Sequence, residues 1–158
     1  MTAINGNYEF LELAHKDYVT TIWLNRPEVR NAFHEGLIGE IISAFREADA
    51  DEQTRIILLR GKGKSFCAGA DLNWMKNVAS YTYDENLTES LQLSECFKTI
   101  YNASKPTIAY VHGAAMGGAN GLIAACDMAY ADPETTFSLS EVRIGIIPAC
   151  IGPYIIKR

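Results

Sequence analysis

Three short apolar segments, each followed by a turn, constrain the fold of this chain most strongly. They read RIILLRG at 55–61, TIAYVHG at 107–113 and DMAYAD at 127–132. The first two are nearly continuous apolar runs, which are typical of buried strands, and the third is predicted as a further strand. Helical patterns alternate with these segments along the chain. The alternation of strand, turn and helix therefore predicts an α/β domain with largely parallel strand pairing.

The spacing of apolar residues predicts the remaining elements. Residues 10–24 alternate around the polar turn His15-Lys16-Asp17, which indicates a β-hairpin. Helices are predicted over 34–49, 86–103 and 117–125, whereas the polar segment 73–84 receives no assignment. One face of the helix over 86–103 is expected to carry its apolar residues, which are Leu87, Leu91, Phe97, Ile100 and Tyr101.

Composition excludes several classes of protein. The chain has 158 residues, which fit one domain over 1–158, and 48% of them are hydrophobic and supply its core. The net charge is −5 and no run of Lys or Arg is present, so no nucleic-acid partner is expected. No apolar run long enough to span a membrane occurs. The four cysteines lie far apart without a CxxC pair, which favours free thiols in a reducing, cytoplasmic compartment over a zinc site or a disulfide framework.

Two turns of small residues follow predicted buried strands and lead toward helices. They read SFCAGADLNWM at 65–75 and VHGAAMGGANGLIAAC at 111–126. Small residues let a ligand approach backbone N–H groups, and two such turns can direct two donors at one oxygen that becomes negative during a reaction. The alternative is that the glycines only permit tight packing of strand on helix. The second turn lacks both the Gly-Lys-Ser/Thr ending and the GxGxxG spacing of nucleotide-binding loops.

The segment TTFSLSEVRIGIIPA at 135–149 places one carboxylate among apolar and hydroxyl-bearing residues. Glu141 is expected to be partly desolvated there, and therefore suited to proton transfer. Ser138 and Glu141 also match the capping-box pattern of a helix start, and the pattern leaves both interpretations open. The histidines suggest no metal site, and His112 is interpreted as a structural residue at the end of a buried strand.

Four motifs, in their order and spacing, resemble those of the crotonase family, the enoyl-CoA hydratases and isomerases. They are NRPEVRNAF, FCAGADL, HGAAMGGANGLIAACDMAYA and FSLSEVRIGIIPA, and the resemblance covers about residues 8–158. It implies a spiral of repeated ββα units. It also implies that the backbone N–H groups of Ala70 and Gly118 bind the thioester carbonyl of an acyl-CoA and stabilise the enolate formed from it.

The same resemblance implies where coenzyme A lies. It is expected only as part of the thioester substrate, with no permanently bound cofactor. Val29 and Arg30 would flank it on one side. The residues implied on the other side come from the two turns and are Ala68, Gly69, Ala70, Asp71, Leu72, Asn73, Gly117 and Gly118.

The catalytic carboxylate implied by the resemblance is Glu141, but a second one is missing. Hydratases of the family usually carry another glutamate three residues after the oxyanion-hole glycine, where this chain has Gly121. One carboxylate is enough to move a proton between carbons, which favours an enoyl-CoA delta-isomerase or another single-glutamate relative. The segment LSEVRIGIIPA instead resembles that of bacterial hydratases of branched, carboxylated enoyl-CoAs, such as 3-methylglutaconyl-CoA hydratase of leucine degradation. A hydratase is therefore expected, with the isomerase as the alternative.

Further residues are candidates for the site. The side chains that could hold a water are Asn120, Ser138 and Ser140, and those that could form a pocket wall are Trp74, Met75 and Tyr81. The chain ends in IGPYIIKR, where another helix is expected to start. Members of the resembled family carry a C-terminal helical part that closes the site and builds trimers or hexamers. We therefore expect the N-terminal core domain of a longer homotrimeric or hexameric enzyme, or else an inactive or merely CoA-binding fragment of one.

Overall fold

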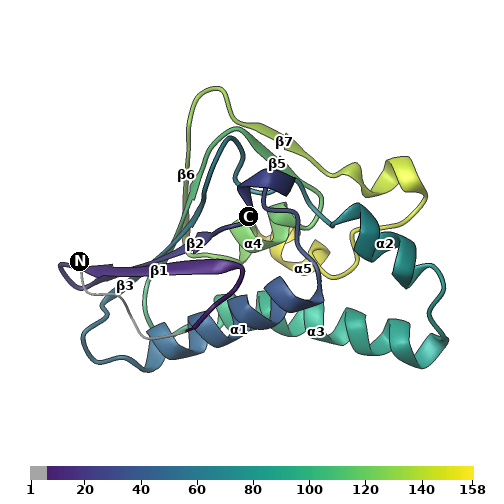
Figure 1. Ribbon diagram of the computed structural model, residues 1–158. Helices are drawn as coiled ribbons and strands as arrows, with labels where there is room; N and C mark the ends of the chain where they lie inside the picture. The colour runs from purple at the N-terminus through teal and green to yellow at the C-terminus, as the bar shows by residue number, and fades with distance from the viewer. Residues whose placement is uncertain (1–6) are drawn as a thin grey trace.

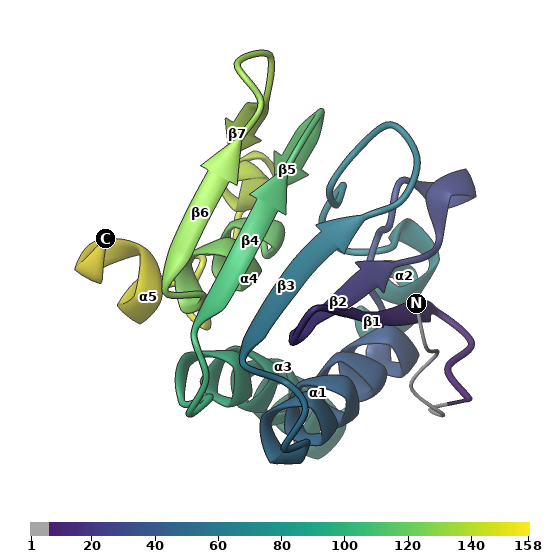
Figure 2. The same cartoon turned by 90° about the vertical axis from the view of Figure 1, so that its left-hand side faces the viewer.

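A five-stranded sheet with the order β1-β2-β3-β4-β6 organises the computed structural model, which describes residues 7–158 apart from the side chain of Ile144. β1 and β2 pair antiparallel, and the other three neighbouring pairs are parallel. The sheet faces the viewer in Figure 2. The prediction of a largely parallel α/β domain is confirmed. The strands are β1 (Leu11–Lys16), β2 (Val19–Leu24), β3 (Ile56–Gly61), β4 (Thr107–Val111) and β6 (Met128–Ala131).

The first two strands form the predicted hairpin. Its turn consists of Asp17 and Tyr18, both with positive φ, at 50° and 66°. Two consecutive left-handed residues match the right-handed twist of the flanking strands, which is why such two-residue turns connect hairpins. The turn lies at the end of the predicted polar stretch.

Helices α1 (Glu35–Ala50) and α3 (Tyr83–Tyr101) run side by side below the sheet (Figure 1) and are joined by an ion pair between Arg46 and Glu95 at 2.7 Å. The shorter helices are α2 (Leu72–Val78), α4 (Ala119–Ala125) and α5 (Gly152–Lys157). Apolar residues from the strands and from α1, α3 and α4 form one buried core. Within residues 7–158, no helix has the length and apolar character that crossing a bilayer would require.

A second, smaller layer of parallel pairings lies at the carboxyl ends of the main strands. β5 (Ala114–Met116) pairs with β7 (Thr136–Ser138), and single bridges join Phe33 to Ala70 and Cys67 to Ala115. From β2 onward, each main strand leads into one extended segment of this layer and then into a helix. This repetition confirms the spiral of ββα units that the resemblance implies.

Two expectations about local structure are wrong, and one unassigned segment is helical. The unassigned segment 73–84 contains most of α2 and the start of α3, and the glycine-rich turn contains β5, so that α4 starts at Ala119 instead of residue 117. Leu87, Leu91 and Tyr101 are 44%, 60% and 42% exposed, although they were expected on the apolar face of this helix. Only the second half of α3 packs into the core, because its buried residues are Cys96, Phe97 and Ile100.

Candidate active site

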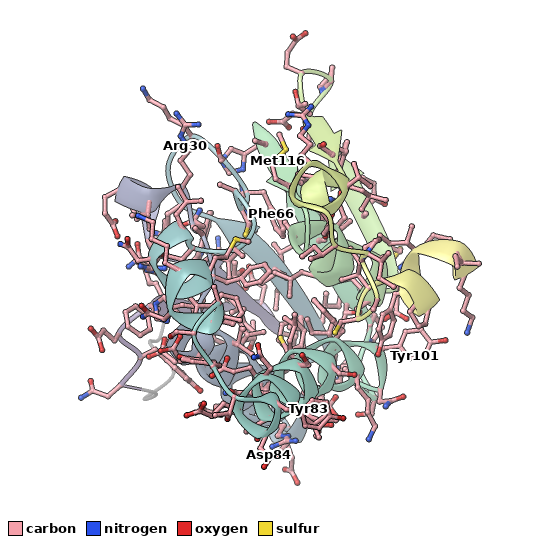
Figure 3. The ribbon with its side chains drawn as sticks, turned by 90° about the vertical axis from the view of Figure 1, so that its right-hand side faces the viewer. Arg30, Phe66, Tyr83, Asp84, Tyr101 and Met116 are labelled. Carbon is pink, nitrogen blue, oxygen red and sulfur yellow. The ribbon has the colours of Figure 1, made fainter. Side chains whose placement is uncertain are left out.

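A cavity of about 540 Å³ brings together the three residues with expected catalytic roles, Ala70, Gly118 and Glu141. It lies between α2, α3 and the segment that runs from the 3-10 helix η2 (Ser140–Ile144) to α5. Figure 3 views the side of the molecule on which these elements lie. The wall is mainly apolar, with side chains such as Trp74 and Met75 from α2. Both were pocket-wall candidates, whereas Tyr81 does not line this cavity.

The backbone N–H groups of Ala70 and Gly118 are free to bind a ligand. Within residues 7–158, neither donates a hydrogen bond to another protein group. The amides beside them are engaged, because Asp71 N donates to Phe33 O at 2.9 Å and Gly117 N donates to Ser138 O at 2.8 Å. Two unused N–H donors in a cavity wall can bind an oxygen that carries negative charge.

Hydrogen bonds between the two turns hold these donors in place. Cys67 N donates to Ala114 O, and Met116 N donates back to Cys67 O, both at 3.1 Å. Gly69 has φ of +91°, and a Cβ atom at this residue would lie 2.9 Å from Met116 O. Glycine is therefore required where the first turn passes over the second.

Phe33, which the sequence did not identify as a site residue, lies against Gly118. Phe33 N donates to Gly69 O at 2.9 Å, and a Cβ atom at Gly118 would lie 2.4 Å from the Phe33 ring. Only glycine fits beneath the ring, so packing and access to the amide both require it. The position of Phe33 at the end of NRPEVRNAF was the available signal.

Glu141 projects from η2 and has no partner for one of its oxygens. Its Oε2 atom is buried without a hydrogen bond to the rest of residues 7–158. Its Oε1 atom faces the glycine-rich turn that contains Gly117 and Gly118, because a Cβ atom at Gly117 would lie 3.3 Å from it. The residue that precedes η2 is Leu139 and provides no side-chain cap, so the capping-box interpretation is excluded. Glu141 instead presents an unpaired carboxylate to the cavity.

Two of the three candidates for holding a water form hydrogen bonds with the turn at Gly117. Asn120 Nδ2 donates to Gly117 O and to Ser138 O, each at 3.0 Å. Ser138 O accepts from Gly117 as well, and neither serine candidate lines the cavity. Asn120 therefore stabilises the turn that presents the Gly118 amide.

Among the residues expected beside coenzyme A, Ala70 and Gly118 line the cavity, whereas the others lie outside its lining. Val29 and Arg30 are exposed, and Arg30 O accepts from Ala68 N at 2.9 Å; the Arg30 side chain extends away from the fold in Figure 3. Leu72 and Asn73 start α2 and are exposed. The structure thus leaves Val29, Arg30, Leu72 and Asn73 accessible at the surface.

Asp71 differs from these neighbours because it is engaged within the protein. Its carboxylate accepts from Asn73 N at 2.9 Å and pairs with Arg26 at 3.1 Å. Burial alone would raise the pKa of Asp71, but these two interactions outweigh burial and the pKa lies below its usual value. This carboxylate therefore stabilises the turn and caps α2.

Gly121, where a second glutamate was expected from the family pattern, has no room for a side chain. It is buried in α4, and a Cβ atom there would lie 2.3 Å from Ile151 Cγ2 and 2.8 Å from Phe97 Cε1. Ile151 and Phe97 therefore occupy the space into which a side chain would extend, and both belong to the core.

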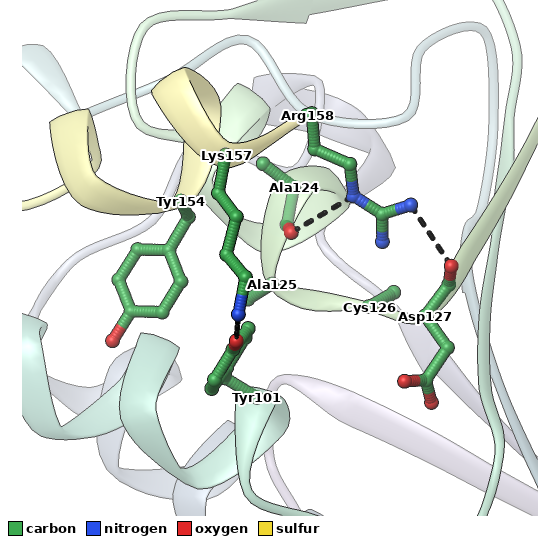
Figure 4. A pocket seen from close by; sticks show the side chains of 8 residues that line it. All are labelled: Tyr101, Ala124, Ala125, Cys126, Asp127, Tyr154, Lys157 and Arg158. Atoms are coloured by element: carbon green, nitrogen blue, oxygen red, sulfur yellow. Dashed lines mark hydrogen bonds between the residues drawn. The ribbon is translucent and has the colours of Figure 1, made fainter.

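A second cavity, of about 250 Å³, lies among α3, α4 and α5 (Figure 4). Its two cationic side chains bind protein groups. Lys157 donates to the Tyr101 hydroxyl, and Arg158 donates to the carbonyl oxygens of Ala124 at 3.3 Å and Asp127 at 2.8 Å. These contacts attach α5 to the domain. His112 is likewise structural, since its Nε2 atom lies 2.9 Å from Gly63 O.

Comparison with known proteins identifies the family. A sequence model described as enoyl-CoA hydratase/isomerase matches residues 14–158. The chain belongs to this family. An enoyl-CoA hydratase of Shewanella pealeana, known from a crystal structure, is 40% identical with a TM-score of 0.93, and the match covers 96% of this chain and 57% of that one. The solved structure of AtuE from Pseudomonas aeruginosa is 32% identical with a TM-score of 0.91, over 95% and 58% of the two chains.

Curated relatives of the family carry both names. An enoyl-CoA hydratase of Alternaria alternata is 35% identical over 98% of this chain and 48% of its own length. A mitochondrial Delta(3,5)-Delta(2,4)-dienoyl-CoA isomerase of Dictyostelium discoideum is 33% identical over 89% of this chain and 52% of its own. The chain thus spans about half the length of these relatives, and it shares the crotonase fold with the solved structures.

Proposed function

We propose that the whole protein adds water across the 2,3 double bond of an enoyl-CoA thioester. One observation carries this proposal: the free amides of Ala70 and Gly118 and the unpaired carboxylate of Glu141 line the same cavity. The amides hold the thioester oxygen and stabilise the enolate, and one such donor is typically worth about 3–4 kcal/mol at the transition state. Glu141 lies beside the turn that contains Gly117 and Gly118, and it exchanges a proton with C2, the carbon next to the thioester.

Coenzyme A belongs to the substrate in this proposal. Its pantetheine and nucleotide would lie outside the cavity, along the surface formed by Val29, Arg30 and residues 68–73. The acyl chain would enter the apolar cavity between α2 and α3. No permanently bound cofactor is required for this reaction.

The acyl group is the finer part of the proposal. The residues that line the cavity include Glu89 and Glu141 but no Lys, Arg or His. A neutral enoyl tail matches this lining without a further cation. The carboxylated tail of 3-methylglutaconyl-CoA, the substrate predicted from the motifs, would need a cation from residues outside the cavity wall. Activity toward 3-methylglutaconyl-CoA stays a prediction, as does a place in leucine degradation.

An enoyl-CoA delta-isomerase is the second candidate, and the packing of Gly121 favours it. Because this residue cannot hold the usual first glutamate, Glu141 is the one carboxylate at the two family positions. Relatives named as dienoyl-CoA isomerases match the chain as well. The reaction product distinguishes the two candidates, since hydration removes the conjugated double bond and isomerisation moves it.

The test is incubation of the full-length protein with crotonyl-CoA and with 3-methylglutaconyl-CoA, with products read by mass spectrometry and NMR. A gain of one water is expected. Glu141→Gln should reduce the rate by about 10²–10⁴-fold, the usual contribution of one acid/base group. The exposed Glu134 lies outside the cavity, so Glu134→Gln is the matched control. A shifted double bond without added mass would establish the isomerase instead.

We also propose that further chain covers part of this domain. Apolar side chains of β7, η2 and α5 are exposed, among them Phe137, Val142 and Ile156. Exposed apolar patches of this kind usually mark interfaces. A C-terminal helical part and neighbouring subunits of a cytoplasmic homotrimer or hexamer would cover them. Light scattering of the full-length protein tests the assembly, and a monomer would contradict it.

A further inference from the structure

We propose that Glu89 of α3 is the second proton-transfer residue of this cavity and performs the role for which Gly121 leaves no room. The inference rests on the proposed hydratase function. It names the residue that would accept a proton from the attacking water, whereas Glu141 exchanges a proton with C2. No sequence motif of the family contains Glu89, and only the tertiary structure brings it to the cavity.

Burial without a partner distinguishes Glu89 from the other acidic residues of α3. Glu89 and Glu141 are the acidic residues that line the cavity, and the Oε2 atom of each is buried with no hydrogen bond to the rest of residues 7–158. On the same helix, Glu85 forms the capping box with Thr82, and Glu95 pairs with Arg46. A buried carboxylate oxygen without a partner costs stability, so its retention at a cavity wall points to a bound group.

Two neighbouring aromatic rings, those of Trp74 and Phe33, lie beside Glu89 and Gly118 respectively. The Trp74 indole N–H faces the Glu89 carboxyl, and Trp74 Nε1 also lacks a well-aligned partner. The Trp74 ring lies 6.3 Å from the Phe33 ring, which in turn covers Gly118. Phe33 and Trp74 therefore belong to one wall of the cavity that Gly118 and Glu89 also line.

The surroundings of Glu89 also favour a base of useful strength. Burial raises the pKa of the Glu89 carboxyl, and the negative charge of Glu35 on α1 raises it further, while the Trp74 N–H opposes the shift. The other ionisable groups that face this region are Tyr81, before α3, and Glu141 across the cavity. A carboxylate with a raised pKa is a stronger base near neutral pH.

The two carboxyl groups then divide the reaction between them. The oxygen of a water bonds to C3 while its proton passes to the ionised Glu89. The C2–C3 π electrons move toward the thioester, whose oxygen is held by the Ala70 and Gly118 amides. Glu141 delivers a proton to C2, which lies next to the thioester. Proton exchange with solvent afterwards returns both carboxyl groups to their starting states, and the net change is addition of one water.

Two assays on the full-length protein separate this role from a structural one. The first is hydration of crotonyl-CoA. The second is exchange of the C2 protons of butyryl-CoA with ²H₂O, which needs the amides and Glu141 but no water addition. Glu89→Gln should lower kcat for hydration about 100-fold or more, with little change in KM, and leave the exchange rate within about threefold. Glu89→Asp should recover part of the hydration rate.

The controls make each failure distinct. Glu141→Gln should abolish both reactions, and Glu95→Gln, on the same helix but outside the cavity, should change neither. In the wild type, kcat should fall as the pH drops through the raised pKa of Glu89, and Glu89→Gln should lose that limb. Equal losses of hydration and exchange in Glu89→Gln would make the residue structural and overturn the inference. Hydration within threefold of wild type would also overturn it, while leaving the proposed function intact. A wild type that never hydrates crotonyl-CoA or 3-methylglutaconyl-CoA would refute the proposed function itself.

Discussion

A single methyl group at Gly121 tests the packing that excludes a second glutamate from its usual place. Its Cβ atom would lie 2.3 Å from Ile151 Cγ2 and 2.8 Å from the Phe97 ring, well inside ordinary contact distance. Added volume in a packed core typically costs about 1–3 kcal/mol. Against this cost, replacing Gly by Ala inside a helix gains about 1 kcal/mol. Gly121→Ala is therefore best compared with a Gly→Ala variant at another helical position. The helix-propensity gain is then the same, but the added Cβ atom has no close neighbour.

Gly39 in α1 supplies that control. Its added Cβ atom would have one neighbour, Gln92 Nε2, at an ordinary 3.6 Å. The helix-propensity gain cancels between the two variants, so Gly121→Ala should be less stable than Gly39→Ala by about 1–3 kcal/mol. Urea unfolding followed by tryptophan fluorescence, with a reductant for the free thiols, measures the difference in free energy of unfolding.

Equal stability of the two variants would refute the reasoning. It would mean that Ile151 and Phe97 move aside at no cost, and that packing does not explain why this chain lacks the first glutamate. In that case Gly121→Glu should fold and raise hydration. The structure predicts instead that Gly121→Glu is destabilised and does not raise the rate.

Three further predictions concern the supports of the site. Asp71→Asn removes the charge paired with Arg26. Because folding lowers the pKa of Asp71, the wild type should be more stable than this variant above about pH 4, the ordinary pKa of Asp, and its advantage should decline as the pH falls toward the lowered pKa. Urea midpoints of both proteins at pH 7 and pH 3 measure this advantage. An equal advantage at both pH values would contradict it. Thr82→Ala breaks the capping box of α3 and should cost about 1 kcal/mol by the same assay, whereas no loss would mean that the cap is dispensable. Leu91→Ser should stay within about 0.5 kcal/mol of the wild type because Leu91 is exposed, and a larger loss would show that this face is covered.

Local patterns were sufficient for much of the fold. The three apolar runs form β3, β4 and β6, and α1 and α3 begin within a few residues of their predicted starts. These elements are predictable because the hydrophobic periods of strands and helices repeat over only a few neighbouring residues. The short strands β5 and β7 were missed. Each has three residues, and their pairing partners lie more than 20 positions apart in the chain, so no local pattern indicates them.

For the site, the sequence indicated two turns of small residues and a single acid in an apolar segment, because such features are visible without neighbours in space. The resemblance to the crotonase family then pointed to Ala70, Gly118 and Glu141. Only the tertiary structure decided that Phe33 covers Gly118, that Ile151 closes the space at Gly121 and that Glu89 reaches the same cavity as Glu141. These facts depend on contacts between segments that are distant in sequence. Burial and steric overlap exist only once the layers have packed against one another.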